Sequence, residues 1–292
     1  MSGESRTRVN GWSIAGRTVA ITGGSAGIGK AAALALAAMS AKIVIVGRDH
    51  DKHQSVLGLI AAAGGKASLV EADLSDLSQV ARAGHILRDL DPPLTVLINN
   101  AGVAGARGVT VDGFELAFGV NHLAHFLLTS LVLASMITNA PGRILTVSSE
   151  AHRRFGPADG DWAHWNRVTG STRSATGIAE YQRSKAANVA FTVELNKRLA
   201  GLDLVAVSIH PGVIATRIWR RIPRPLRGLA TRRMLPPELG AAVVVNCATA
   251  AHLVSGGYYT PRGLEPASQY ATDPAVAGEL WRTSEEMVGR WL

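Results

Sequence analysis

The chain has 292 residues, 47% of them hydrophobic, which allows one large α/β domain or two small ones with a sizeable core. Its single cysteine, Cys247, excludes an intrachain disulfide and fits a reducing compartment. The net charge of +8 favours acidic partners, anionic lipid or nucleic acid only if the basic residues cluster.

The domain organisation is inferred from whether linkers divide the chain. No linker rich in Ser, Pro or Gly is present, so we expect an N-terminal tail over 1–15 and one domain over 16–292. The tail is polar and lacks the apolar region of a signal peptide. We take no uncharged run to be long enough for a transmembrane helix, and therefore expect a cytoplasmic protein.

Apolar runs typical of buried strands recur along the chain and are separated by helical stretches. This alternation predicts an α/β fold of the Rossmann type, a doubly wound parallel sheet of about seven strands with helices on both faces. The predicted strands cover residues 18–21, 42–46, 67–70, 95–98, 143–147, 204–209 and 258–260.

The stretch TGGSAGIG over 22–29 joins the first apolar run to an Ala-rich helical segment. Glycines permit the sharp turn and the close backbone approach that hold a diphosphate at a helix N-terminus. The spacing departs from the general dinucleotide fingerprint, and a glycine-rich turn without a ligand is the alternative. Cofactor contacts are expected from Gly23, Ser25, Gly27, Ile28 and Gly29.

The second predicted strand ends in Gly47, Arg48 and Asp49, where dinucleotide enzymes bind the adenosine ribose. A carboxylate at the first of these places would accept a hydrogen bond from the ribose 2′-OH and repel a 2′-phosphate, but Gly47 stands there. Arg48 can bind a phosphate bidentately, which favours NADP(H) over NAD(H). The alternative is that Arg48 is a surface residue and Asp49 accepts from the ribose.

Ligands of doubly wound sheets bind beyond the carboxyl ends of the strands, so the residues after each later strand are further candidates. After the third strand, Asp73 and Leu74 are expected at the adenine, with helix capping by Asp73 as an alternative. The fourth and sixth strands are followed by turns, whose plain role as turns is the alternative. Further cofactor contacts are expected from Asn100, Ala101, Gly102, Pro211, Gly212 and Val213.

A helix expected over 120–136 carries Asn121, His122 and His125 near its start. Histidines three residues apart can share a metal ion, but no third ligand stands nearby in sequence. We therefore expect packing or capping roles for both histidines, and no metal.

The fifth predicted strand ends in Ser148 and Ser149, and Tyr181 and Lys185 open a later helix. Residues four apart share one helix face. An ammonium group near the phenol lowers the tyrosine pKa from its usual value of about 10, so that the phenol becomes a usable acid or base. Such a pair arises by chance on many helices, but with Ser149 and the glycine stretch it indicates an active site.

Two stretches, 152–178 and 214–236, are expected to form substrate lids, because long loops in compact domains are usually functional. Arginines gather over 217–233. A solvated helix face is the simplest interpretation; peripheral membrane contact stays open, and no nucleic-acid partner is expected. An aromatic pocket for an apolar ketone, or packing under the loops, would use Phe155, Trp162, Trp165 and Trp219.

Taken in chain order, these motifs resemble the short-chain dehydrogenase/reductase family over nearly the whole chain from Gly16 onward. The motifs are the glycine stretch, NNAG over 99–102, Asn121, Ser149, Tyr181 with Lys185, and Pro211-Gly212. The sequences NHLAHFLLT over 121–129, SSEAH over 148–152 and WRTSEE over 281–286 are similar to the retinol dehydrogenase-like branch of that family.

The resemblance implies an NADP(H)-dependent oxidoreductase that interconverts a ketone or aldehyde and the corresponding alcohol on a largely apolar small molecule. It implies that Tyr181 is the general acid/base, that Lys185 lowers its pKa and holds the nicotinamide ribose, and that Ser149 polarises the carbonyl. It also implies that Asn121 anchors a water in the proton relay and that the protein is a monomer or homodimer. The alternative is a non-catalytic dinucleotide-binding regulator or scaffold, against which the complete set of four side chains argues.

Overall fold

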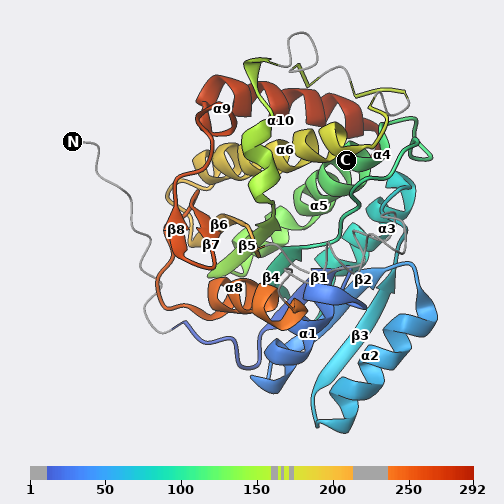
Figure 1. Ribbon diagram of the computed structural model, residues 1–292. Coiled ribbons are helices and arrows are strands. Elements are labelled where there is room, and N and C mark those ends of the chain that lie inside the picture. The colour runs from blue at the N-terminus through green and yellow to red at the C-terminus, as the bar shows by residue number, and fades with distance from the viewer. Residues whose placement is uncertain (1–11, 159–163, 166–167, 171–173, 213–235) are drawn as a thin grey trace.

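The computed structural model describes residues 12–158, 164–165, 168–170, 174–212 and 236–292. At its centre lies an eight-stranded sheet in the order β3-β2-β1-β4-β5-β6-β7-β8 (Figure 1). In chain order the strands are β1 (Thr18–Thr22), β2 (Lys42–Gly47), β3 (Lys66–Glu71), β4 (Leu94–Asn99), β5 (Gly142–Val147), β6 (Leu204–Ile209), β7 (Tyr258–Thr260) and β8 (Gly263–Glu265).

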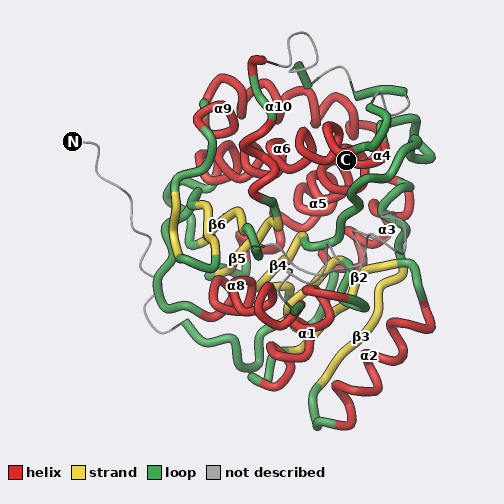
Figure 2. The backbone as a smooth tube through the Cα atoms, in the orientation of Figure 1, coloured by secondary structure: helices red, strands yellow, loops and turns green. Residues whose placement is uncertain are grey.

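Helices connect these strands, as the tube in Figure 2 shows. The α-helices of the described residues are α1 (Gly27–Ala38), α2 (His50–Ala62), α3 (Leu77–Arg88), α4 (Leu116–Phe118), α5 (Ala124–Thr138), α6 (Ile178–Arg198), α8 (Pro237–Thr249), α9 (Gln269–Thr272) and α10 (Pro274–Val288). A π-helical turn, η1 (Gly119–Leu123), joins α4 to α5, and 3-10 turns form η2 (Glu150–Arg154) and η5 (Gly289–Trp291).

The sheet is buried between two layers of helices, and this explains why the central strands read as continuous apolar runs. Every residue of β1, β4, β5 and β6 is buried. One face packs against α1, α2 and α8, and the other packs against α3, α5 and α6, with α10 outside α6 (Figure 1). Two hydrophobic cores therefore lie on opposite faces, and the predicted doubly wound α/β fold is confirmed.

The sheet has eight strands, one more than the expected number of about seven. The strands from β1 to β7 are all parallel to one another, and β8 pairs antiparallel with β7 at the edge of the sheet. The tight turn between them ends at Gly263, whose φ of +102° favours glycine. Because two of the three residues of β8 are exposed, this strand leaves no apolar run in the sequence.

The expectation that no uncharged run has transmembrane length is wrong in one place. The stretch Leu116–Thr138, which comprises α4, η1 and α5, is 23 residues long with a mean hydropathy of 1.6 in its most apolar window. However, 78% of that window is buried inside the structure, where it packs against the sheet and α3. Its apolar character is therefore that of a core helix.

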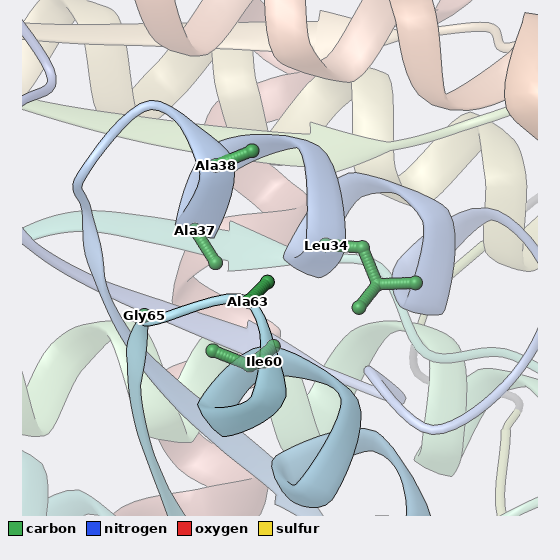
Figure 3. A pocket seen from close by; sticks show the side chains of 6 residues that line it. All are labelled: Leu34, Ala37, Ala38, Ile60, Ala63 and Gly65. Atoms are coloured by element: carbon green, nitrogen blue, oxygen red, sulfur yellow. The ribbon is translucent and has the colours of Figure 1, made fainter.

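A small hollow lies between the C-terminal parts of α1 and α2 (Figure 3). Its volume is about 30 Å³, which is room for one or two water molecules. The hollow is lined by Leu34, Ala37, Ala38, Ile60, Ala63 and Gly65. It is apolar, lies away from the glycine turn at the start of α1, and is too small for a cofactor.

Candidate active site

The turn between β1 and α1 requires its glycines. Gly23 and Gly27 have φ values of +68° and +54°, in the left-handed region that favours glycine. A Cβ atom built on Gly29 would lie 2.5 Å from both Asn100 Nδ2 and the carbonyl oxygen of Gly23. The turn thus places bare backbone at the N-terminus of α1, as a dinucleotide diphosphate needs, with Ser25 and Ile28 half-buried beside it.

Thr22, the last residue of β1, fixes the loop that follows β4. Its hydroxyl oxygen accepts hydrogen bonds from the backbone N–H groups of Asn100 and Ala101, both at 2.9 Å. The Asn100 side chain in turn donates to the carbonyl oxygen of Thr22 at 2.8 Å. The predicted cofactor residues 100 and 101 therefore lie directly beside the glycine turn, and the Asn100 amide serves to hold the two segments together.

His125 connects this network to η1. Its Nδ1 lies 3.0 Å from the Asn121 carbonyl oxygen, which only accepts, so Nδ1 carries the proton. Its Nε2 is then the acceptor for the Thr22 hydroxyl at 2.9 Å. Burial lowers the pKa of His125 to about 4 and that of His122 to about 3, so both rings are neutral. His122 is held by Ser284 at 2.8 Å, and both imidazoles thus have packing and hydrogen-bonding roles.

The Asn121 side chain clamps the loop after β4 against α6. Its Oδ1 accepts from Val103 N at 2.8 Å, and its Nδ2 donates to Val103 O and Ser184 Oγ, both at 2.9 Å. A Cβ atom on Gly102 would lie 3.1 Å from Asn121 Oδ1 and 3.7 Å from Lys185 Nζ. The Asn121 side chain is therefore engaged by protein atoms at both Oδ1 and Nδ2.

Ser149, Tyr181 and Lys185 meet at the carboxyl edge of the sheet. Ser149 makes a hydrogen bond with the Tyr181 phenol, and Lys185 Nζ lies 5.7 Å from the centroid of the Tyr181 ring. Lys185 also donates to the carbonyl oxygen of Val147 at 2.8 Å. The Ser148 hydroxyl instead donates to the backbone carbonyl of Lys185 at 2.7 Å, away from the phenol. Of the two serines, Ser149 is thus the one that faces Tyr181.

The pKa of Tyr181 differs from the sequence-based expectation. Burial raises it, and the hydrogen bond from Ser149 only partly offsets that rise. Burial also lowers the pKa of Lys185, to about 7. The expected lowering of the tyrosine pKa by the ammonium group is therefore wrong for this structure, because burial is the main cause of the pKa shift at both groups. We call Asn121, Ser149, Tyr181 and Lys185 the Tyr181 cluster.

At the other end of the same edge, Arg48, His50, Glu71 and Asp73 form what we call the Arg48 cluster. Arg48 pairs with Asp73 at 2.9 Å, and His50 pairs with Glu71. Burial raises the pKa of Asp73, but hydrogen bonds from Ser75 and Arg48 outweigh it and leave the pKa lowered. The Arg48 side chain is 71% exposed, so it remains within reach of an anionic ligand. The Asp49 side chain instead caps α2 by accepting from Lys52 N at 3.3 Å.

The structure describes only some of the other residues that we expected at the cofactor or the substrate. Leu74 is buried in the core, so its side chain packs inward. Pro211 and Gly212 follow β6, where Gly212 has a φ of +93°. Val213, Trp162, Trp219, the arginines over 217–233 and most of the 214–236 lid lie outside the described residues.

Two buried aromatic residues belong to the hydrophobic core. Trp165 and Phe155 are 0% and 3% exposed, and their ring centroids are 5.4 Å apart. Trp165 also donates to the carbonyl oxygen of Val276 at 3.2 Å. Packing under the loops, one of the two expected roles, is the one observed for this pair.

Sequence reasoning missed two residues that organise the site. Thr22 was treated only as the start of the glycine motif, although a hydroxyl at the end of a buried strand was a usable signal. His152 is fully buried, donates from Nδ1 to the Ser149 carbonyl oxygen at 2.7 Å and accepts from Ser268 N at 3.0 Å. It therefore ties the backbone of Ser149 to the segment before α9, a contact that no spacing in the sequence indicates.

Comparison with known proteins identifies relatives of this chain over most of its length. The family model described as short chain dehydrogenase matches residues 17–158. A Streptomyces protein named "Putative daunorubicin C-13 ketoreductase DnrU" is 38% identical over 94% of this chain and 93% of its own length. Mouse retinol dehydrogenase 14 is 36% identical over 94% of this chain and 86% of its own length. The solved Pseudomonas aeruginosa RhlG/NADP active-site complex is 27% identical, with a TM-score of 0.67 over 85% of this chain and 95% of that one.

The chain belongs to the short-chain dehydrogenase/reductase family, in its retinol dehydrogenase-like branch. It is therefore an oxidoreductase whose fold implies binding of an NAD(P) dinucleotide. The residues present fit such a cofactor. The glycine turn leaves bare backbone for the diphosphate, and the absence of a Cβ at Gly102 leaves room beside Asn121 and Lys185.

Proposed function

We propose that this protein is an NADP(H)-dependent oxidoreductase that interconverts a ketone or aldehyde and the corresponding alcohol on a largely apolar small molecule. The observation that carries the proposal is the convergence of the Ser149 hydroxyl, the Tyr181 phenol and the Lys185 ammonium at the carboxyl edge of the sheet. The names of its relatives, a ketoreductase and a retinol dehydrogenase, support this reaction class. We also propose a cytoplasmic location, because the free cysteine of this chain, Cys247, suits a reducing compartment.

Several segments of this chain are suited to hold NADP(H), which when bound supplies or accepts a hydride at carbon. The backbone of the glycine turn would hold the diphosphate at the N-terminus of α1. Arg48 would bind the 2′-phosphate, because its guanidinium group is exposed and a phosphate matches its geometry. Lys185 and the 99–102 loop would hold the nicotinamide ribose. Preference for NADP(H) over NAD(H) rests on Arg48 and on Gly47, which carries no carboxylate.

The proton steps fall to Tyr181 and its neighbours. In reduction, Tyr181 would donate its proton to the carbonyl oxygen as that oxygen gains negative charge, and Ser149 would donate a hydrogen bond to the same oxygen. A pKa raised by burial keeps the phenol protonated and ready to donate. Lys185, with a pKa of about 7, can release a proton near neutral pH and so resupply Tyr181. In oxidation the same groups would remove the proton from the alcohol.

Replacement of the phenol tests the catalytic assignment. Tyr181→Phe keeps the ring and removes the proton, so we expect turnover to fall by about 10²-fold or more with cofactor binding largely intact. Turnover would be measured as NADPH oxidation against ketones, aldehydes and quinones, with NADH as the control. Cofactor binding would be measured separately by calorimetry. A variant that retains near-parental turnover with bound cofactor contradicts the role of Tyr181.

A further inference from the structure

A buried histidine occupies the place where the side chain of residue 47 would lie. A Cβ atom built on Gly47 would lie 2.7 Å from His53 Nε2 and 2.8 Å from His53 Cε1. Real Cβ atoms do not approach other atoms this closely, so any side chain at position 47 displaces the imidazole. His53 itself is 1% exposed, on the first turns of α2. The end of β2 thus stays free of a side chain because His53 fills its space.

The orientation of His53 is fixed by its other nitrogen. Nδ1 donates to the carbonyl oxygen of Asp49, since a carbonyl oxygen only accepts. Burial lowers the pKa of His53, which favours the neutral ring and leaves Nε2 as an acceptor without a proton. Among the residues that the structure describes, Nε2 has no hydrogen-bond partner although it is buried. Such an unsatisfied atom is uncommon in a folded protein and calls for an explanation at this position.

The position matters because of the chemistry at the end of the second strand. In doubly wound dinucleotide-binding folds, an acidic side chain there accepts hydrogen bonds from the adenosine ribose of NAD and repels the 2′-phosphate of NADP. We propose that Gly47 and His53 act together as a cofactor-specificity element, in which the imidazole takes the space of the ribose carboxylate. This inference rests on the proposed NADP(H) function and adds His53 to Arg48 as a residue that determines it.

Gly47 and His53 together would produce an effect on cofactor binding that Arg48 alone would not. An acid introduced by Gly47→Asp would displace the imidazole, and a carboxylate next to the ring would favour its protonated form, whose Nε2 could then donate to that carboxylate. That carboxylate would then be lost to the ribose hydroxyls. Removal of the ring by His53→Ala would free it. The effects of the two substitutions on NAD⁺ affinity are therefore expected to be strongly non-additive, as for other residues in direct contact.

The experiment is an equilibrium titration of NADP⁺ and of NAD⁺ by calorimetry. It compares the parent, Gly47→Asp, His53→Ala and the double variant. We expect the parent to prefer NADP⁺ and each single variant to bind NAD⁺ within about threefold of the parent. The double variant should bind NAD⁺ about tenfold tighter or more, since a hydrogen bond to a carboxylate contributes that much. Gly47→Asn in the His53→Ala background has the same size without the charge, and should gain less.

Thermal unfolding of each variant, together with NADP⁺ binding by His53→Ala, shows that the site is folded. If Gly47→Asp alone gains as much NAD⁺ affinity as the double variant, or if the folded double variant gains none, the role of His53 is wrong while the proposed function stands. A parent that binds neither dinucleotide overturns the proposed function and this inference with it. A parent that prefers NAD⁺ overturns the NADP(H) preference on which the inference rests.

Discussion

At the Tyr181 cluster, Lys185 and Asn121 are 3% and 0% exposed, whereas at the Arg48 cluster the side chains of Arg48 and His50 are 71% and 60% exposed. Both clusters lie at the carboxyl edge of one sheet, so the same edge carries buried charged groups at one end and exposed charged groups at the other. Buried groups shift their pKa and depend on every partner, because water cannot replace a lost contact. Exposed ion pairs contribute little to stability, and their residues are free to select a ligand.

The largest effect is expected at Lys185, the buried charge of the Tyr181 cluster. Lys185→Met should reduce turnover about 10²-fold or more, because it removes the proton donor next to Tyr181. The same change should raise the free energy of unfolding of the protein without cofactor. Burial lowers the Lys185 pKa from 10.5 to about 7, so the folded state opposes the charge that the unfolded state holds readily. The gain near pH 7 is on the order of 4 kcal/mol.

The pH dependence of that gain provides the check. A lysine whose folded pKa is depressed destabilises the fold fully below pH 7, and this penalty disappears as the pH rises towards 10.5. Urea unfolding at pH 7 and pH 10 should therefore show the difference between Lys185→Met and the parent shrinking. If the variant is less stable than the parent at pH 7, burial does not lower the pKa of Lys185 as we infer. Arg48→Met, which removes an exposed charge, is the matched control and should leave stability within about 0.5 kcal/mol.

A smaller effect is expected at His125. The pKa of His125 is about 4 in the folded state, against 6.5 for a histidine exposed to water, so the unfolded chain takes up a proton first as the pH falls. Stability is therefore lost between pH 6.5 and pH 4, by about 2 kcal/mol at pH 5. His125→Gln should abolish this part of the loss, while the exposed His85→Gln should not. This loss is measured from the unfolding free energies of the parent, His125→Gln and His85→Gln at pH 7 and pH 5. An unchanged pH slope in His125→Gln would show that the ring is protonated in the fold.

The sequence alone was sufficient to predict the features that depend on residues close together in the chain. Apolar runs predicted the sheet, and the four-residue spacing of Tyr181 and Lys185 predicted their shared helix face. The contact between Thr22 and His125 joins residues 103 positions apart, and no local pattern records it. The pKa of Tyr181 was predicted in the wrong direction because its sign depends on burial, which spacing does not reveal. For the same reason, the sequence does not reveal that the His53 imidazole fills the space where a side chain of residue 47 would lie.

The smallest stability effect and the clearest selectivity effect are expected together at Arg48. Arg48→Ala should change the free energy of unfolding by less than about 0.5 kcal/mol, because its ion pair with Asp73 is exposed. It should weaken NADP⁺ binding about tenfold, as expected for one charge-assisted contact to phosphate, and leave NAD⁺ binding unchanged. Titrations at low and high salt should show that the parent loses NADP⁺ affinity more steeply than the variant. Equal losses for NADP⁺ and NAD⁺ would mean that Arg48 shapes the loop and does not contact the 2′-phosphate, and the contrast between the two clusters would then no longer hold.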